Sequence, residues 1–241
     1  MAEQTVESPF SSESVIRGRF GTLASTRGYD VVIRVVFICC ILLLALPNAA
    51  GVAARMRVQP GLWDLSLLAE ILARGAVLPF FALAAWLALV RMRPIGKAQG
   101  LRPRLSALAG SFLLLSVVLF PRHDLSTGLN LLSAGLIVLG HLLAVYALAW
   151  LGRSFSIMAE ARRLVTGGPY ALVRHPLYVA EAIAAIGLFL QYASPWVALV
   201  MVASLAFQLQ RMRNEEQILR ATFPEYAAYA ARTRRLIPGV Y

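Results

Sequence analysis

Long apolar runs dominate this chain and limit what it can fold into. They extend over about 31–51, 67–90, 105–120 and 129–151. A helix needs about 20 apolar residues to cross the hydrocarbon core of a bilayer, within a range of roughly 17–25. The first, second and fourth runs reach this length, whereas the third is slightly short and begins after Pro103. The sequence therefore predicts an all-α integral membrane protein.

A different apolar segment follows at 177–210. It contains two stretches of about fifteen residues, which residues 191–195 join. Each stretch is short for a complete span, so the pair is predicted to form a short helical hairpin that thins the bilayer or leans on neighbouring helices. We expect about six apolar helical segments in all, followed by a cytoplasmic C-terminal helix.

The composition supports a membrane protein and argues against a soluble domain. Of the 241 residues, 59% are hydrophobic and 15% are charged, and the mean hydropathy is +0.69. Soluble domains carry about 45–50% apolar and about 25% charged residues. A water-soluble fold of this size could not bury the excess of apolar surface, so lipid must form part of the solvent.

The basic residues, which give a net charge of +11, predict the orientation. Eighteen of the 23 Arg and Lys lie in the tail, in the loops 91–104 and 152–176, and in the segment 211–241, whereas the alternate connections hold three. Cytoplasmic loops collect such residues. We therefore expect six crossings, with both termini and the active site in the cytoplasm. The preference for Arg over Lys hints at a GC-rich bacterial genome, so the expected location is a bacterial inner membrane, and nucleic-acid binding is not expected.

A few polar residues inside or near the apolar runs predict structural contacts. Glu70 and Arg74 are four residues apart, so we expect an ion pair that faces the bundle, and a substrate role is the less favoured alternative. Arg34 lies close enough to a helix end to reach the membrane surface. His141 is expected to make a hydrogen bond between packed helices. The sequence shows no metal-binding grouping of His or Cys.

Two polar segments at the predicted cytoplasmic boundary carry the candidate chemistry. The first passes through a Gly-Gly-Pro turn at 167–169 to Arg174, His175, Pro176 and Tyr178. Pro176 suits the first turn of a helix, whose free N–H groups and partial positive charge would face the cytoplasm. This segment is the entrance of the predicted hairpin.

The second polar segment is the exit of the hairpin, with Arg211, Glu215 and Glu216. An antiparallel hairpin brings its entrance and exit to the same membrane surface, so the two segments form one candidate site. Each residue also has a structural interpretation, as an interfacial anchor, a solvated helix end or an aromatic belt. Taken singly, that interpretation is favoured, and the convergence of the residues favours a site.

The order of these motifs resembles the isoprenylcysteine carboxyl methyltransferase family, which is related to the phospholipid methyltransferases. The resemblance covers about residues 150–241, and two positions depart from it, because Ala180 and Pro224 stand where the family usually has glycine. The matching residues are Leu151-Gly152-Arg153-Ser154-Phe155-Ser156, Leu164-Val165-Thr166-Gly167-Gly168-Pro169-Tyr170, Arg174-His175-Pro176-Leu177-Tyr178, the Glu215-Glu216 pair, and Leu219, Phe223, Tyr226, Tyr229 and Arg235-Leu236-Ile237-Pro238.

The resemblance implies methyl transfer from S-adenosylmethionine to a lipophilic or lipidated substrate, with a carboxylate oxygen as the favoured acceptor. It assigns Arg211 and Arg174 to catalysis, with Arg211 near the substrate carboxylate. Such a carboxylate is already an anionic nucleophile, so positioning and desolvation would supply most of the catalysis. The residues assigned to the cofactor are Leu164, Val165, Tyr170, His175, Pro176, Tyr178, Glu215 and Glu216.

Two other functions remain open from the sequence. One is an NADPH-dependent membrane reductase of the sterol reductase type, which resembles the same hairpin family. The other is a nonenzymatic membrane protein. The expected organisation is a polar tail at 1–28 with a short interfacial helix near 15–20, a four-helix transmembrane region at 29–151, and a methyltransferase-like cofactor-binding region at 152–241. Membrane lipids are expected partners.

Overall fold

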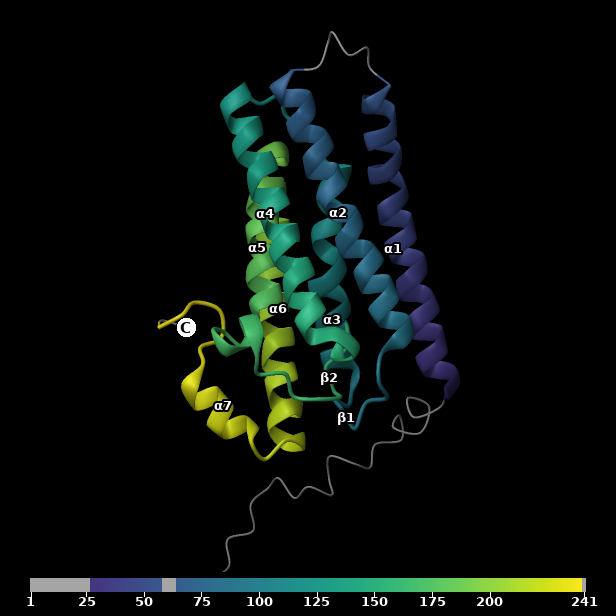
Figure 1. Ribbon diagram of the computed structural model, residues 1–241, viewed down its shortest axis with the longest axis vertical. Coiled ribbons are helices and arrows are strands. Elements are labelled where there is room, and N and C mark those ends of the chain that lie inside the picture. Colours follow the sequence, from purple (N-terminus) through teal and green to yellow (C-terminus); the bar gives the residue numbers. More distant parts are fainter. Residues whose placement is uncertain (1–26, 58–63, 240–241) are drawn as a thin grey trace, which may run out of the picture.

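A computed structural model describes residues 27–57 and 64–239, and it consists of one bundle of helices (Figure 1). The short helix expected near 15–20 lies outside the described residues. The α-helices are α1 (Arg27–Met56), α2 (Leu65–Val90), α3 (Leu101–Phe112), α4 (Thr127–Leu151), α5 (Pro176–Tyr192), α6 (Pro195–Thr222) and α7 (Tyr226–Arg232). Short 3-10 helices are η3 (Leu113–Leu119), η4 (Gly152–Ser154) and η5 (Gly168–Ala171), and the strands are β1 (Gly96–Lys97) and β2 (Glu160–Ala161).

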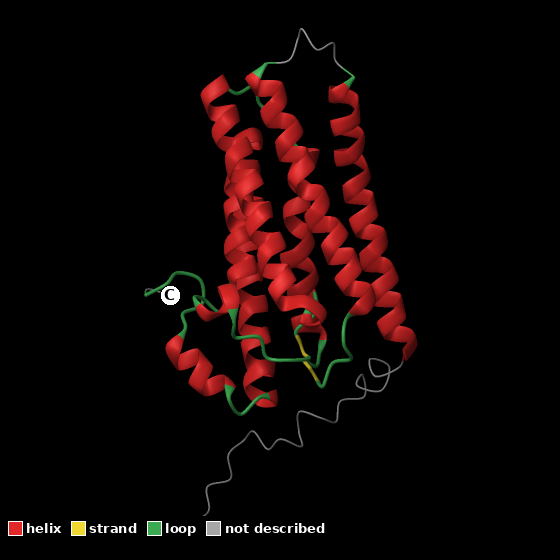
Figure 2. Ribbon diagram, in the orientation of Figure 1, coloured by secondary structure: helices red, strands yellow, loops and turns green. Residues whose placement is uncertain are grey.

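The prediction of an all-α membrane protein is confirmed, because almost all regular structure in the described residues is helical (Figure 2). Four segments are long and apolar enough to cross a bilayer, namely Val31–Met56, Leu65–Val90, Leu101–Leu119 and Thr127–Ser154. The helix α5 is apolar but has only 17 residues. The count of six crossings therefore stays a prediction.

The third apolar run is extended by a change of helix type. Its α-helix ends at Phe112, and η3 continues the run to Leu119. A 3-10 helix rises about 2.0 Å per residue and an α-helix about 1.5 Å, so the two parts together span roughly 30 Å, close to the thickness of the hydrocarbon core. The tighter winding compensates for the shortness of this run.

The predicted hairpin is right in its connection and in its packing against neighbouring helices, and it is wrong in the length of its second helix. Ala193 and Ser194 join α5 to α6, and the Ser194 side chain accepts a hydrogen bond of 3.2 Å from the Val197 N–H. The two helices lean on their neighbours, because α5 packs mainly against α4 and α6 packs mainly against α3. With 28 residues, however, α6 is not short, because it continues past the apolar stretch to Thr222. The residues expected at the hairpin exit therefore lie within one long helix.

Glycine permits the close contact between α4 and α5. A Cβ atom added to Gly140 would lie 2.6 Å from the Ala184 nitrogen and 2.7 Å from the Ala180 oxygen. A Cβ atom on Gly187 would lie 2.7 Å from the Ser133 oxygen. Ala180, which departs from the family glycine, is tolerated because the facing residue in α4 has no side chain. This contact holds the start of α5 beside the end of α4.

Two short strands, which the sequence did not predict, cover the end of the bundle where α4 ends and α5 begins. This end is called the motif end below. The strands β1 and β2 pair antiparallel. Arg162 donates from Nε to the Met92 oxygen at 2.6 Å, and Arg153 donates from Nε to the Val90 oxygen at 2.8 Å. These bonds hold the loop that follows α4 against the loop that follows α2.

The opposite end carries an ionic cluster around Glu70. The predicted ion pair with Arg74 is confirmed, with 3.1 Å between Nη2 and Oε1. The fold adds Arg55 at 2.6 Å from Oε2 and Arg122 at 2.7 Å from Oε1. One carboxylate thus joins α1, α2 and the loop before α4, which the sequence spacing could not indicate.

Two other polar side chains bond backbone oxygens. Arg34 donates from Nη1 to the Leu89 oxygen at 2.7 Å, near the end of α2, where helix carbonyls lack partners within the helix. The hydrogen bond expected between helices at His141 is instead within α4, because Nδ1 lies 2.8 Å from the Ile137 oxygen. The imidazole ring packs edge-on against Phe80, and this contact joins α4 to α2.

Candidate active site

The entrance to α5 is shaped by a glycine turn and by pairing with the C-terminal segment. Gly168 has a φ of +59°, and a Cβ atom there would lie 2.3 Å from the Trp150 indole, so only glycine fits this position. Farther along, the Arg174 and His175 nitrogens donate to the Arg234 and Arg235 oxygens at 2.7 and 3.0 Å. The motif is therefore held from both sides before Pro176 begins the helix.

Glu216 lies at the centre of a buried ionic cluster. It is 5% exposed, and its carboxylate contacts Arg174 Nε at 2.8 Å, His175 Nε2 at 3.2 Å and Arg235 Nη2 at 2.9 Å. Burial alone would raise the pKa of Glu216, but the hydrogen bonds from His175, Arg235 and Arg174 outweigh it and hold this pKa well below its usual range. Arg174 also donates to the Ala230 and Thr233 oxygens. The cluster fastens α6 to the motif and to the chain after α7.

Glu215 points the other way and is shared by α5 and α6. Its Oε1 accepts from the Tyr178 hydroxyl at 2.7 Å and from Arg211 Nε at 3.1 Å. Its Oε2 lies 3.9 Å from His175 Nδ1, and the side chain is 20% exposed. The Arg211 guanidinium also lies over the Tyr178 ring, 5.2 Å from its centroid. One carboxylate oxygen is thus held by two hydrogen bonds, whereas the other has only the 3.9 Å contact with His175 among the described residues.

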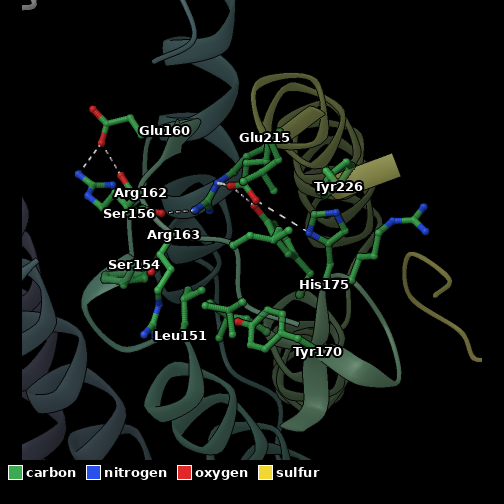
Figure 3. A pocket seen from close by; sticks show the side chains of 18 of the residues that line it. Leu151, Ser154, Ser156, Glu160, Arg162, Arg163, Tyr170, His175, Glu215 and Tyr226 are labelled. Atoms are coloured by element: carbon green, nitrogen blue, oxygen red, sulfur yellow. Dashed lines mark hydrogen bonds and ion pairs between the residues drawn. The ribbon is translucent and has the colours of Figure 1, made fainter. Parts of the chain in front are cut away.

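These side chains surround a pocket of about 100 Å³ at the motif end, lined by both polar and apolar side chains. Figure 3 shows Leu151 and Ser154 on one side of it, and His175 and Tyr226 on the other. The walls come from the end of α4, the loop 154–165, η5, the start of α5, α6 and α7. The lining residues are Leu151, Ser154, Phe155, Ser156, Met158, Glu160, Arg162, Arg163, Leu164, Val165, Tyr170, Arg174, His175, Leu177, Tyr178, Arg211, Glu215, Leu219, Tyr226 and Tyr229.

The pocket brings together most of the site residues expected from the sequence, and two of them lie outside it. Pro176 and Glu216 are not part of the lining. Pro176 occupies the first position of α5, and Glu216 is taken up by its ionic cluster. The expected residues that line the pocket are Leu164, Val165, Tyr170, Arg174, His175, Tyr178, Arg211 and Glu215.

Two hydroxyl groups in the lining were not expected as site residues. Ser154 Oγ and the Tyr226 hydroxyl are buried, and neither has a hydrogen-bond partner among the described residues. Buried polar groups are normally bonded, so these two residues are candidates for a hydrogen bond to a polar ligand. Both residues lie in the segments that carry the family resemblance, which is the signal that could have identified them.

The tyrosines near the pocket are neutral donors. Burial raises the pKa of Tyr170 and of Tyr226 far above the usual value, and it raises the pKa of Tyr229 to about 12. The Tyr229 hydroxyl donates to the Tyr170 oxygen at 2.7 Å, so α7 is fixed to η5. Since these phenols keep their protons at neutral pH, the Tyr226 hydroxyl can donate to a ligand.

The fold and the site define a class of protein, namely a helical membrane protein with a pocket at one end of its bundle. A family model described as phospholipid methyltransferase matches residues 129–226. The match includes α4, so it begins earlier than expected from the motifs. Together with a plant relative described below, it confirms the resemblance to the isoprenylcysteine and phospholipid methyltransferases over this segment.

Three relatives show the same similarity in part of their length. The chain is 39% identical over 99 residues to the cobalt-zinc-cadmium resistance protein CzcN of Cupriavidus metallidurans. This aligned segment covers 38% of this chain and 45% of the relative. The chain is 38% identical over 82 residues to the nickel-cobalt-cadmium resistance protein NccN of Alcaligenes xylosoxydans xylosoxydans. This aligned segment covers 33% of this chain and 38% of the relative. The chain therefore spans less than half the length of these two relatives.

The third relative is the protein-S-isoprenylcysteine O-methyltransferase B of Arabidopsis thaliana. The chain is 30% identical to it over 131 residues, which is 52% of this chain and 66% of the relative. Although the names of the first two relatives refer to metals, no group of three or more His, Cys, Asp or Glu within 27–57 and 64–239 is placed to hold a metal ion. The comparisons therefore show that part of this chain resembles membrane methyltransferases.

The pocket residues fit the chemistry of S-adenosylmethionine. This cofactor has a cationic sulfonium, an amino acid end that carries both charges, and a ribose diol. The open Oε2 of Glu215 can accept from a hydroxyl or an ammonium group. The hydroxyls of Ser154 and Tyr226 can bond polar groups of a ligand, and the exposed Arg163 side chain can face a carboxylate. The apolar side chains of Leu164 and Val165 can pack against a planar base.

Proposed function

We propose that this protein is an S-adenosylmethionine-dependent methyltransferase that acts on a lipophilic acceptor in the membrane. One observation carries the proposal. A single pocket gathers the motif residues of α5, α6 and η5, and its wall contains two buried hydroxyls that have no hydrogen-bond partner among the described residues. The family match of residues 129–226 covers most of this pocket.

The proposed roles follow from the contacts of each side chain. When bound, the cofactor supplies an electrophilic methyl group on a sulfonium centre. Glu215 is held by Tyr178 and Arg211, so its second oxygen has a fixed direction for binding. Arg174 and Glu216 act as positioning residues, because their bonds connect the motif to α6 and to the C-terminal segment. His175 lies between Glu215 and Glu216 and closes that side of the pocket.

A carboxylate acceptor at Arg211 was the expectation from the sequence, and it stays a proposal, which the position of Arg211 in the pocket lining supports. Arg211 donates to Glu215 from Nε, to Ser111 Oγ at 2.9 Å from Nη1, and to the Ser156 oxygen at 3.4 Å from Nη2. Each nitrogen of the guanidinium thus has a partner within the protein. Two of the five N–H groups of Arg211, one on each terminal nitrogen, remain for a substrate carboxylate.

The NADPH-dependent reductase and the nonenzymatic alternatives have no observation in their favour. Equilibrium binding of labelled S-adenosylmethionine and of labelled NADPH to the purified full-length protein in lipid nanodiscs distinguishes the methyltransferase from the reductase and from the nonenzymatic protein. The proposal expects saturable binding of S-adenosylmethionine and none of NADPH. Binding of NADPH alone would support the reductase, and binding of neither would support a nonenzymatic protein.

A further inference from the structure

The ionic cluster around Glu70, at the end of the bundle opposite the motif end, carries an excess of positive charge. The guanidinium groups of Arg55, Arg74 and Arg122 all contact this one carboxylate, and their side chains are 29%, 31% and 33% exposed. No second acid pairs with any of the three within 27–57 and 64–239. Three positive charges thus meet one negative charge beside apolar helices, where an unbalanced charge is costly. This place therefore favours an additional anion.

The arginines of the cluster have donors that Glu70 does not use. Glu70 Oε1 accepts from Nε and Nη2 of Arg74 and from Nη1 of Arg122, and Oε2 lies 2.6 Å from Arg55 Nε. A guanidinium carries five N–H groups. Both terminal nitrogens of Arg55, and Nε and Nη2 of Arg122, have no hydrogen-bond partner in the described part of the chain. Because both oxygens of Glu70 are occupied, a ligand at this place meets hydrogen-bond donors.

The guanidinium groups are brought to one point by three separate segments. A Cβ atom on Gly51 would lie 2.9 Å from Arg74 Nη1, so glycine lets this side chain of α2 lie against the backbone of α1. Arg55 comes from the last turn of α1, and Arg122 comes from the loop before α4. The planar forks of arginine match the oxygens of a phosphate. The cluster is thus arranged for such a group before any ligand binds.

The cluster lies at one end of a larger cavity inside the bundle. Its volume is about 580 Å³, within the range of roughly 300–1,000 Å³ that is usual for small-molecule sites. Glu70, Arg74 and Arg122 belong to its lining, and the walls next to them include Val77 and Val118. The other polar side chains that line this end are uncharged, namely Asn48, Gln191 and Tyr192. A ligand here therefore needs an anionic group for the arginines and hydrocarbon for the walls.

Helix α1 has few other attachments to the bundle. It lies at one edge and packs mainly against α2 (Figure 1). Of the residues in its most apolar 18-residue stretch, 6% are buried. Since Arg55 belongs to α1 and Arg122 to the loop before α4, an anion that bonds both arginines fastens α1 to the rest of the bundle.

We propose that Arg55, Arg74 and Arg122 bind the phosphate of an anionic phospholipid, one acyl chain of which lies in the adjacent end of the cavity. Basic pockets between transmembrane helices bind such head groups. A free phosphate would leave the apolar walls uncovered, and a zwitterionic head would bring a cation for which Glu70 has no free oxygen. The cluster precedes residue 129, where the family match begins, so the site is separate from the methyltransferase segment. Lipid binding at this end does not require methyl transfer.

Equilibrium binding to the full-length protein in dodecyl maltoside tests the choice of head group. The probes are labelled dioleoylphosphatidylglycerol and dioleoylphosphatidylcholine, which share both acyl chains and the phosphate but differ in net charge. We expect the parent to bind the glycerol lipid about tenfold more tightly, the factor that one hydrogen bond to a charged group provides. Arg55→Gln and Arg122→Gln should each remove most of this preference. Arg57→Gln and Arg213→Gln remove the same charge from exposed positions at this end and at the motif end, and both should keep the preference.

Glu70→Gln distinguishes an anion site from a purely structural ion cluster. This variant keeps the three arginines and removes their counter-charge, so it should bind phosphatidylglycerol at least as tightly as the parent. If the cluster is only structural, Glu70→Gln and Arg122→Gln both lower the thermal midpoint and leave the lipid preference unchanged, and the inference is wrong. Equal affinities of the two lipids for the parent overturn it without any variant.

Two further measurements on the parent give the location of the lipid and the source of the phosphate. Dioleoylphosphatidylglycerol with a photoreactive group in one acyl chain should cross-link to residues that line the cavity near the cluster, such as Val77. Peptide mass spectrometry identifies the cross-linked segment, and cross-links confined to the motif end would contradict the site. Inorganic phosphate in large excess should not displace the lipid. Complete displacement would show that the arginines take a free phosphate, and the assignment to a lipid would be wrong.

Discussion

The hydroxyl of Tyr178 donates a hydrogen bond of 2.7 Å to Glu215 Oε1 and thereby joins the start of α5 to the far part of α6. The same oxygen accepts from Arg211 Nε at 3.1 Å. Because Oε1 is held twice, the direction of Oε2 into the pocket depends on Tyr178 and Arg211. The geometry of the proposed cofactor site can therefore be tested from residues on both helices.

Tyr178→Phe is expected to weaken binding of S-adenosylmethionine by about tenfold, since a hydrogen bond to a charged group contributes roughly 1.5–3 kcal/mol. Glu215→Gln should weaken it at least as much, because the charged acceptor itself is lost. Isothermal titration calorimetry on detergent-purified protein measures both. Tyr146→Phe, which changes an exposed tyrosine of α4, is the control. Parent-like affinity in both site variants would remove Glu215 from the cofactor site.

Arg211→Lys tests whether Arg211 orients Glu215 or only anchors the helix at the membrane surface. An ammonium group is a point charge and cannot bond Glu215, Ser111 and the Ser156 oxygen as the planar guanidinium does. We expect weaker binding of S-adenosylmethionine and lower turnover, because Glu215 loses its orientation. Arg213→Lys, at an exposed position two residues later, should behave like the parent. If Arg211→Lys is also unaffected, Arg211 is only an anchor at the membrane surface.

Glu216→Gln is expected to reduce thermal stability more than it reduces cofactor binding or methyl transfer. The substitution leaves Arg174, His175 and Arg235 without their charged partner, and breaking a buried ion pair costs about 3–5 kcal/mol. The thermal midpoint in detergent should fall, whereas Glu225→Gln should leave it unchanged. A variant that melts like the parent but binds no cofactor would place Glu216 in the binding site instead.

The stability difference between the parent and Glu216→Gln should depend on pH. Folding lowers the pKa of Glu216 from its ordinary 4.5. A carboxylate of this kind stabilises the folded state fully above its unfolded pKa, and the contribution is lost as the pH falls through the folded pKa. The difference in thermal midpoint should therefore be constant above about pH 5 and shrink below pH 4.5. A difference that grows on acidification would contradict this account.

Gly140→Ala is expected to destabilise the contact of α4 with α5. Its Cβ would lie 2.6 Å from the Ala184 nitrogen, and such overpacking costs typically about 1–3 kcal/mol. Gly135→Ala is the matched control in the same helix, because a Cβ there meets nothing within 4 Å. The readout is the thermal midpoint in detergent. If the two alanine variants have the same thermal midpoint, α4 and α5 are farther apart at Gly140 than the structure shows.

Membrane orientation can be tested with single cysteines in a background in which Cys39 and Cys40 are replaced by alanine. The charge distribution predicts that Leu172→Cys, in the loop 152–176, is protected in intact cells from a reagent that cannot cross the membrane. Asp124→Cys, in the connection before α4, should be labelled. Both positions are exposed in the structure, so accessibility within the protein is matched. Labelling of Leu172→Cys but not of Asp124→Cys would show that the orientation is opposite to the predicted one.

The sequence by itself determined the class of protein and the parts of the site that depend on local patterns. Apolar runs near 20 residues require lipid, whatever the packing of the helices. The Glu70–Arg74 pair was predictable because residues four apart share a helix face. The motif residues beside Pro176 were predictable for a similar reason, since proline marks the start of a helix and the order of the motifs resembles a known family.

Only the tertiary structure decided how the helices pair and which polar groups meet. Two neighbouring glutamates have different contacts, because their side chains leave α6 in different directions, Glu215 toward the pocket and Glu216 toward Arg174 and Arg235. The partnership of Glu181 with Gln208 depends on the rotation of two helices about their axes. Local periodicity shows the faces of one helix but not the face of another that it meets. That choice depends on side-chain packing over the whole bundle, such as the contact at Gly140.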